Sequence, residues 1–356
     1  MKAGISGILR AKNEGNFIGS CIDSCIDSLD ELVIVYNDCT DDTERIIQQK
    51  ASQYPDKIKA LPYNHNVMVT NLSKEQFEYV SGLPEGALQL HATQCNYALD
   101  ACSYEYAMKI DPDQIYFTDE LSRLRLICKS KAPKFSISIV FGWMVMVYIS
   151  IYRRISAWRG KPCLWMLSLA KVFPFFSNCY SKYCIRQLKI KKAALSLSGI
   201  NVFYDGIWSI PFDGINIHPP YNGEGDTLLF AITDNTSFKK RCRDKVPYAV
   251  IESFDHQYKV LTWLSPIWFH FHANRPYCAD KVYKAKTEHP EWFVEPGVFA
   301  EMSYKDVHNM MNHKSHTLFQ RTLFGIIHTF GRKHLKPHLY MLDKYMPTFM
   351  KNQFKQ

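Results

Sequence analysis

Short apolar runs alternate with helically spaced apolar residues over the first 110 residues. Runs of four to seven residues without a helical period indicate buried strands, expected here at 4–10, 31–36, 58–61 and 106–110. Apolar residues at helical spacing indicate helices at 17–29, 43–54 and 87–102. Strands that alternate with helices predict an α/β fold with a doubly wound, mostly parallel sheet.

A second apolar region, residues 135–152, contains eighteen residues without a charge. Its odd positions are all large and apolar, whereas the even positions include three serines and a glycine. Its length alone would allow a membrane span. The alternation favours one or two strands instead.

The net charge of +9 is unevenly distributed along the 356 residues. Residues 121–204 contain fifteen Lys and Arg and no acidic residue. Such asymmetry indicates a polyanionic partner, either nucleic acid or an anionic membrane surface. In residues 160–192, large apolar residues among basic ones indicate amphipathic helices that lie on a membrane or a helical insert over the sheet. The C-terminal stretch 313–356 could be a second surface anchor or a closing pair of helices.

Cysteine usage and the first residues indicate the compartment. Eleven cysteines are scattered without CxxC pairs, which argues against a disulfide framework and for a reducing cytosol. The opening MKAGISGILRAKNEG has no long apolar region, so no secretory signal peptide is expected. With the basic stretch, these features predict a cytoplasmic protein, peripheral on the inner face of the cell membrane.

Two acids follow the last of the early strands, in YAMKIDPDQIYF (106–117). On an extended backbone Asp111 and Asp113 would point the same way and repel each other. A divalent cation, Mg²⁺ or Mn²⁺, would offset that repulsion; the alternative is a solvated turn. Asn37 and Asp38 also follow a strand end, so two polar clusters are expected at one edge of the sheet.

Four segments, in this order, resemble the family 2 glycosyltransferases with the GT-A fold. They are ILRAKNEGNFIGSCIDSC, VIVYNDCTDDT, HATQCNYALDAC and KIDPDQIYF. The second departs from the family pattern, because Tyr36 replaces a usual acid. The resemblance is strongest over residues 4–120 and marks KIDPDQIYF as the family's DxD motif.

The resemblance implies an inverting, metal-dependent transfer of a sugar from a nucleotide-sugar, a UDP-sugar, to a lipid-linked or polysaccharide acceptor. It implies that Asp113 binds Mn²⁺ or Mg²⁺ directly, whereas Asp111 faces the ribose or the metal shell. It also implies a set of donor-binding residues: Arg10, Asn13, Glu14, Asn37, Asp38, Asn96 and Asp111. For Asn13 and Glu14 the alternative role is a helix cap, and for Asn37 and Asp38 a turn.

An inverting transfer needs a base that takes the proton of the acceptor hydroxyl. In this family the base is an Asp about a hundred residues after the DxD motif, in an acidic loop that begins a helix, and HPPYNGEGDTLLFAI is similar. Asp226 precedes the apolar run 228–232, with Glu224 as its competitor; simple capping of a helix is the alternative role.

Two histidines alternate with aromatic residues in SPIWFHFHANRP, so His270 and His272 should face one side of a strand. Some family members supply a histidine from this region as a further metal ligand, and imidazole suits Mn²⁺ better than Mg²⁺. The choice between the two stays open.

The sequence thus divides into four expected segments. They are a nucleotide-sugar-binding half (1–120), a basic insert (121–204), an acceptor-binding and catalytic half (205–312) and a helical extension (313–356).

Three alternatives remain. A sugar nucleotidyltransferase would show a Gly-rich, Lys- or Arg-bearing phosphate loop, which ISGILRAKNEG lacks. A non-catalytic protein could bind nucleic acid or a membrane through the basic stretch, but the carboxylate edge would repel phosphates, so no nucleic acid partner is expected. The third is a scaffold that has lost the chemistry.

Overall fold

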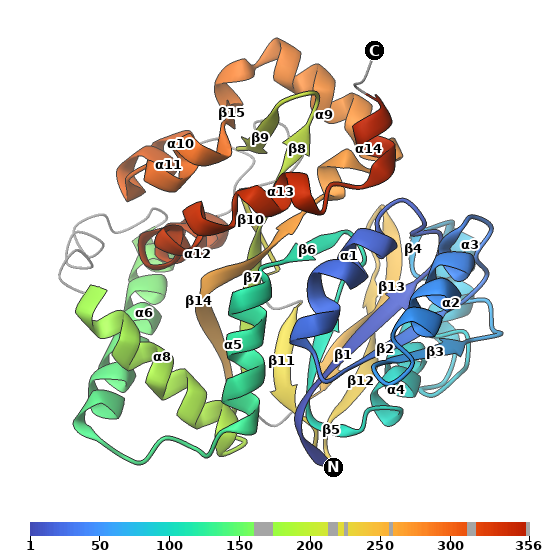
Figure 1. The fold of residues 1–356 in the computed structure, drawn as a ribbon, viewed down its shortest axis with the longest axis horizontal. Coiled ribbons are helices and arrows are strands. Elements are labelled where there is room, and N and C mark those ends of the chain that lie inside the picture. Colours follow the sequence, from blue (N-terminus) through green and yellow to red (C-terminus); the bar gives the residue numbers. More distant parts are fainter. Residues whose placement is uncertain (160–173, 213–219, 224–226, 256–258, 312–317, 354–356) are drawn as a thin grey trace. The chain divides into compact units, whose positions relative to one another are not determined.

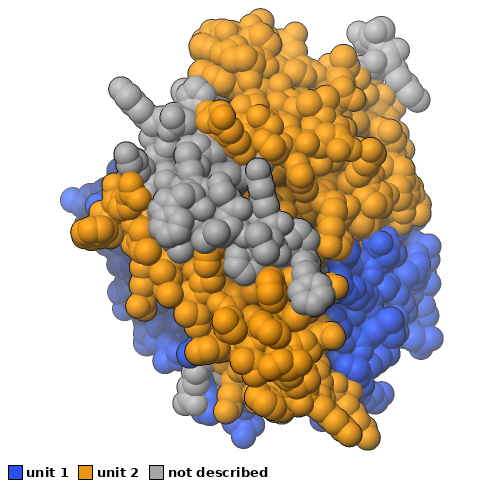
Figure 2. All heavy atoms as spheres, turned by 90° about the vertical axis from the view of Figure 1, so that its left-hand side faces the viewer, with its two compact units in different colours: residues 1–113, 118–130, 229–259 blue, residues 114–117, 131–228, 260–356 orange. Residues whose placement is uncertain are grey.

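The computed structural model describes residues 1–356 except 160–173, 213–219, 224–226, 256–258, 312–317 and 354–356 (Figure 1). The chain forms two compact units (Figure 2). Unit 1 comprises residues 1–113, 118–130 and 229–259. Unit 2 comprises residues 114–117, 131–228 and 260–356.

Unit 1 is built on a parallel sheet with the strand order β3-β2-β1-β5 (Figure 1). The strands are β1 (Lys2–Ala11), β2 (Glu31–Tyr36), β3 (Ile58–Pro62) and β5 (Tyr104–Ile110). Ala11 pairs with Tyr36, and Leu9 pairs with Ile110. The register therefore brings the carboxyl ends of β1, β2 and β5 to one edge. Residues 229–231 of β11 (Leu228–Ala231) add an antiparallel strand beside β5.

Helices cover both faces of this sheet. They are α1 (Ile18–Cys25), α2 (Thr43–Gln53), α3 (Lys74–Gly82), α4 (His91–Asp100) and α5 (Thr118–Lys129), with the short η1 (Ile26–Ser28). The chain steps outward from β1 to β3 through α1 and α2, then returns past β1 to β5 through α4. Right-handed crossovers in opposite directions place their helices on opposite faces. In agreement, α1 contacts α2 and α5, whereas α4 contacts the small sheet on the other face.

That small sheet has the strand order β12-β13-β4. Its strands are β4 (Thr70–Leu72), β12 (Ser237–Arg243) and β13 (Tyr248–Asp255). β12 and β13 pair antiparallel, with Lys240 opposite Glu252 and Phe238 opposite Phe254. The hairpin thereby brings Glu252 next to Lys109, which lies 143 residues earlier in the chain.

Unit 2 contains a sheet with the order β7-β14-β6, and β10 pairs with β7. These strands are β6 (Gln114–Tyr116), β7 (Ala193–Asn201), β10 (Tyr221–Asn222) and β14 (Lys259–His270). Trp268 packs so tightly on Gly199 that an added Cβ would lie 2.0 Å from the indole Nε1. Only glycine fits at that position.

Helices and a second small sheet complete unit 2. The long helices are α6 (Ile137–Arg159), α8 (Pro174–Lys189), α9 (Pro276–Glu288) and α12 (Leu318–Gly331). The shorter ones are α10 (Pro296–Glu301), α11 (Tyr304–Met310), α13 (Tyr340–Lys344), α14 (Thr348–Gln353), η3 (His272–Asn274), η4 (Pro290–Trp292), η5 (Arg332–His334) and η6 (Lys336–His338). The small sheet joins β8 (Phe203–Tyr204), β9 (Trp208–Pro211) and β15 (Phe293–Val294).

These elements confirm the predicted α/β fold with its doubly wound, mostly parallel sheet. Each strand and helix expected before residue 111 is present, with shifts of a few residues at the ends. The C-terminal region is helical where it is described. In the segment 160–192, helix α8 confirms the expected helical structure for residues 174–189. Residues 160–173 of that segment lie outside the described structure. The four expected segments stay a prediction.

Two expectations are wrong. Residues 135–152 do not form strands, because α6 runs as one helix from Ile137 to Arg159. Several even positions, such as Val140, Met144 and Met146, are also apolar, and an unbroken run of this length suits a helix better than a strand. Residues 228–231 form strand β11, not the beginning of a helix.

Among the described residues, Ile137–Ser156 within α6 is the helix whose length and composition would allow it to cross a membrane. Of the 18-residue window in this helix that meets the test, 28% is buried inside the protein.

Candidate functional site

A cavity of about 540 Å³ opens in unit 1 at the carboxyl ends of β1 and β2. Its volume is within the usual range of small-molecule sites, about 300–1,000 Å³. The lining combines two cations and one acid with many side-chain amides. The residues are Arg10, Ala11, Lys12, Glu14, Asn37, Asn66, Val67, Met68, Val69, Thr70, Asn71, Leu72, Gln76, His91 and Gln94. In open α/β sheets, ligands bind at this end of the strands.

Two loops frame the cavity, one after β1 and one after β2. Asn13 (φ 56°) and Asp38 (φ 44°) adopt left-handed backbone conformations, which Asn and Asp tolerate better than most residues. The Asn13 Oδ1 accepts a hydrogen bond from the Thr40 backbone N–H at 2.8 Å. Asp41 binds the first loop through the Gly15 N–H, at 2.9 Å, and its own loop through the Thr43 N–H, at 3.0 Å. The two loops are therefore locked to each other.

Asn37 is held in one orientation. Its carboxamide oxygen accepts from Gln94 Nε2 at 2.8 Å, and its nitrogen donates to Asp38 Oδ2 at 3.1 Å. Asp38 itself is exposed and pairs with Lys12 at 3.3 Å. Asn13 thus acts as a link between loops, and Asn37 as an oriented amide in the cavity wall.

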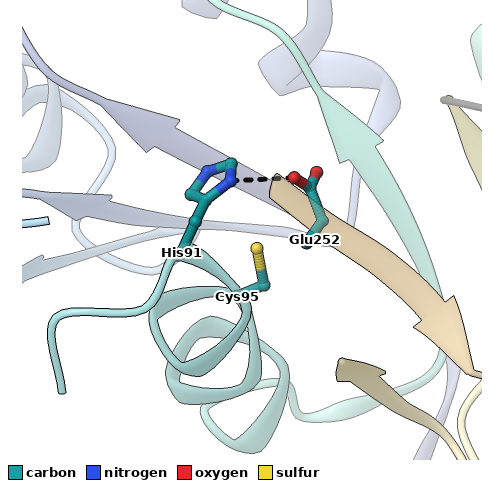
Figure 3. Close-up of side chains that lie close together, drawn as sticks. All are labelled: His91, Cys95 and Glu252. Atoms are coloured by element: carbon teal, nitrogen blue, oxygen red, sulfur yellow. Dashed lines mark ion pairs between the residues drawn. The ribbon is translucent and has the colours of Figure 1, made fainter. Parts of the chain in front are cut away.

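A buried charge network supports one wall of the cavity. The Glu252 carboxylate lies 2.8 Å from His91 Nδ1, 2.9 Å from Lys109 Nζ and 3.4 Å from Arg10 Nη2 (Figure 3 shows the His91 pair). All four side chains are 6–13% exposed. Burial opposes ionisation of Glu252, but Arg10, His91 and Lys109 outweigh it and hold the pKa of this carboxyl well below its usual range. Burial and the nearby Arg10 lower the pKa of His91.

His91, Cys95 and Glu252 offer ligand atoms within 4.8 Å of one another (Figure 3). They do not fit a metal ion. Burial raises the pKa of the Cys95 thiol to about 12, so the thiolate that a metal needs is disfavoured. A cation would also compete with Arg10 and Lys109 for the same carboxylate. The cluster instead positions Arg10 at the cavity.

The Asp111-Pro112-Asp113 motif lies in unit 1, directly after β5. The strand ends at Ile110 and residues 112–113 form a turn, so the expectation of two acids on one face of a strand is wrong. Proline has no N–H with which to continue the strand pairing there. Asp113 is only 3% exposed, and the Asp111 carbonyl accepts from the Cys21 thiol at 3.3 Å.

The donor set of this turn, two carboxylates, suits a divalent cation. Burial and Cys25 raise the pKa of Cys21, and the charges of Asp113 and Asp111 add to that rise. The field of the two carboxylates thus reaches into the core beside α1. Oxygen ligands that create a negative field are those that Mg²⁺ and Mn²⁺ prefer.

His270 and His272 lie in unit 2, and the expectation that they alternate along one strand is wrong. β14 ends at His270, and His272 begins the short helix η3. Their rings are nonetheless close, with centroids 5.5 Å apart. Asn201 Oδ1 lies 2.7 Å from His270 Nδ1. Donation from Nδ1 to Asn201 would place the lone pair on Nε2, the usual arrangement of a metal-binding histidine.

The remaining predicted residues lie elsewhere. Asn96 does not line the cavity; its carboxamide donates to the Phe238 carbonyl at 2.8 Å and accepts from the Phe238 N–H at 2.7 Å. Asp226 and Glu224 lie outside the described residues. Sequence reasoning missed Lys12, His91, Gln94 and Glu252. A histidine at the start of the helix 87–102 was the available signal for His91.

Residues 5–148 match the model of a family described as beta-1,4-N-acetylgalactosaminyltransferase (CgtA). This match confirms the predicted resemblance to glycosyltransferases for that part of the chain. The matched residues include β1, β2, β5, Arg10, Asn37 and the Asp111-Pro112-Asp113 turn. No curated protein matches the chain.

Solved structures similar to the chain include glucosyl-3-phosphoglycerate synthase from Mycobacterium tuberculosis in complex with Mn²⁺, UDP and glucosyl-3-phosphoglycerate. Its sequence is 25% identical, the match covers 32% of this chain and 34% of that chain, and the TM-score is 0.21. A mycobacterial protein is 22% identical over 32% of each chain, also with a TM-score of 0.21. The chain thus spans about a third of the length of these structures.

Proposed function

We propose that this chain is an inverting glycosyltransferase that binds a nucleotide-sugar in the unit 1 cavity. One observation carries the proposal. The cavity lies at the carboxyl ends of β1 and β2, within the part of the chain that resembles a glycosyltransferase family. Arg10, Glu14 and Asn37, which the family resemblance implies as donor-binding residues, all line it.

The lining suits a nucleotide. Arg10 and Lys12 offer positive charge to a diphosphate, and the amides of Asn37, Asn66 and Gln76 can bond a base and a ribose. Glu252 does not line the cavity, but its ion pair holds Arg10 in place there. We propose a UDP-sugar as donor, and the name of the matched family favours an N-acetylhexosamine as the sugar.

Asp113 and Asp111 are the proposed ligands of Mn²⁺ or Mg²⁺. A divalent ion there would stabilise the negative charge that builds on the departing diphosphate. Asp113 would ligate it directly, and Asp111 would face the ribose or the metal shell. Variants His270→Ala and His272→Ala, each measured for Mn²⁺ affinity, would decide whether either histidine adds a ligand.

Asp226 is the proposed base, with Glu224 as its competitor, and the acceptor is a glycan or lipid-linked sugar. The proposed location is peripheral, on the cytoplasmic face of the membrane. Fifteen basic residues without an acid in residues 121–204 support that location.

Release of UDP from UDP-sugars tests the proposed function. The purified protein is incubated with UDP-glucose, UDP-galactose and their N-acetyl analogues, with Mn²⁺ or with a chelator. We expect Mn²⁺-dependent release from at least one donor, and its loss in Asp113→Asn. Asp56→Asn, at an exposed position of unit 1, is the matched control. Full activity of Asp113→Asn would refute the metal assignment.

A further inference from the structure

Helix α6 exposes a row of large apolar side chains on unit 2. Ile137, Met144, Ile151 and Trp158 follow one another at intervals of seven residues, so they share one face of the helix. With Trp143 beside them, they are 45–87% exposed. We call these five side chains the α6 stripe. At about 1.5 Å per residue it runs roughly 32 Å along the helix.

The opposite face of α6 is packed inside unit 2. Ile139, Val145, Ile149 and Tyr152 are buried, and α6 contacts α8 and α12. At Gly142 the backbones of α6 and α8 lie so close together that an added Cβ would be 2.2 Å from the Cys179 carbonyl oxygen. Because one face is fixed against protein, α6 is not surrounded by lipid on all sides. Its exposed face is available to contact a planar surface.

Along α6 and the residues just before it in the chain, the charges have one sign. Arg154 is exposed on the same face, between Ile151 and Trp158 in helical spacing, and Arg159 is exposed at the end of the helix. Lys131 and Lys134 are exposed just before its first turn. No acidic residue occurs between Glu120 and Asp205. An apolar row flanked by cations complements a layer that is apolar inside and anionic at its surface.

We propose that the α6 stripe docks unit 2 on an anionic lipid bilayer, with α6 lying in the plane of the interface. Trp143 and Trp158 would sit at headgroup level, where indoles are favoured. Arg154 and Arg159 would reach anionic headgroups while their stems stay on the apolar side. The proposal deepens the proposed peripheral location and rests on it, but not on sugar transfer.

Vesicle binding tests the proposal. Wild-type protein is sedimented with phosphatidylcholine vesicles that contain about 30% phosphatidylglycerol, and with pure phosphatidylcholine. We expect binding to the anionic vesicles only. Combined substitution Trp143→Ala, Ile151→Ala and Trp158→Ala should weaken it by about tenfold or more. The control combines Leu126→Ala, Ile207→Ala and Val246→Ala, which are 67–81% exposed but outside α6, and it should bind like the wild type.

A second measurement does not depend on replacing large side chains by alanine. Brominated lipids should quench tryptophan fluorescence in the wild type, and Trp143→Phe with Trp158→Phe should reduce the quenching while the protein still binds. Equal quenching in that variant, or unchanged vesicle binding of the alanine variant, would overturn the proposal. So would a wild-type dimer in solution that the alanine variant dissociates, because the α6 stripe would then pair two copies. UDP release by the alanine variant shows separately whether sugar transfer survives.

Discussion

Replacement of Glu252 by glutamine is the sharpest test of the network behind the cavity. The change keeps the shape of the side chain but removes its charge, while Lys109 and Arg10 stay buried at 2.9 and 3.4 Å. Loss of one partner from a buried charged cluster costs about 3–5 kcal/mol. Since glutamine can still accept a hydrogen bond, we expect the lower end, about 3 kcal/mol of unfolding free energy.

Urea denaturation at pH 7 measures the loss. Glu78→Gln is the matched control, because Glu78 is 65% exposed and 3.9 Å from Lys74, a pair worth at most about 1 kcal/mol. Glu252→Gln should also weaken nucleotide binding, since Arg10 loses its anchor. A Glu252→Gln variant as stable as Glu78→Gln would refute the assignment of a supporting role to this carboxylate.

The same residue predicts a pH dependence. The pKa of Glu252 is held below its usual range in the folded state, so its contribution is fully present above the unfolded value of about 4.3. That contribution is lost as the pH falls from there through the folded value. Between pH 6 and pH 3, the wild type should therefore lose more stability than Glu252→Gln. Equal losses would contradict the depressed pKa.

Three further predictions concern other parts of the chain. Gly199→Ala should destabilise the protein by at least about 1–3 kcal/mol, because its Cβ would lie 2.0 Å from Trp268 Nε1; urea denaturation against Gly82→Ala, where a Cβ meets nothing, checks it. Asp226→Asn should lower the transfer rate but leave donor affinity nearly intact, and equal losses in both would remove Asp226 from the role of base. Charge reversal of Lys189, Lys191 and Lys192 should release the protein from anionic vesicles in a sedimentation assay, whereas retention would limit these lysines to a folded, solvated surface.

The sequence predicted the first third of the fold well because the signals there are local. β2 covers residues 31–36 as expected, and α2 and β3 differ from expectation by only one residue at one end. Each is marked by a single clear period and by turn residues on both sides. At 135–152 the apolar residues fit the period of a strand and that of a helix, since odd positions and several even ones are apolar. Length, rather than alternation, was the deciding feature.

The candidate site was predicted only where its residues follow a strand in the same segment. Arg10, Glu14 and Asn37 come directly after β1 and β2 or close to their ends, so chain order indicated them. Glu252 could not be found in this way, because it reaches Lys109 from 143 residues along the chain. Its contact with Lys109 depends on the position of the hairpin β12-β13, which no local sequence pattern predicts. Asn96 resembled a family position, yet its amide bonds the Phe238 backbone.

Thermal melting with nucleotides tests the central claim most directly. The protein is melted with UDP, GDP, ADP or CMP, each with and without Mn²⁺, because a ligand that binds the folded state raises the melting temperature. We predict a rise with one nucleotide, UDP, that requires Mn²⁺, is retained in Asp56→Asn and disappears in Asp113→Asn. If no nucleotide shifts the melting temperature, the cavity is not a nucleotide site and the Asp111-Pro112-Asp113 motif is an ordinary turn.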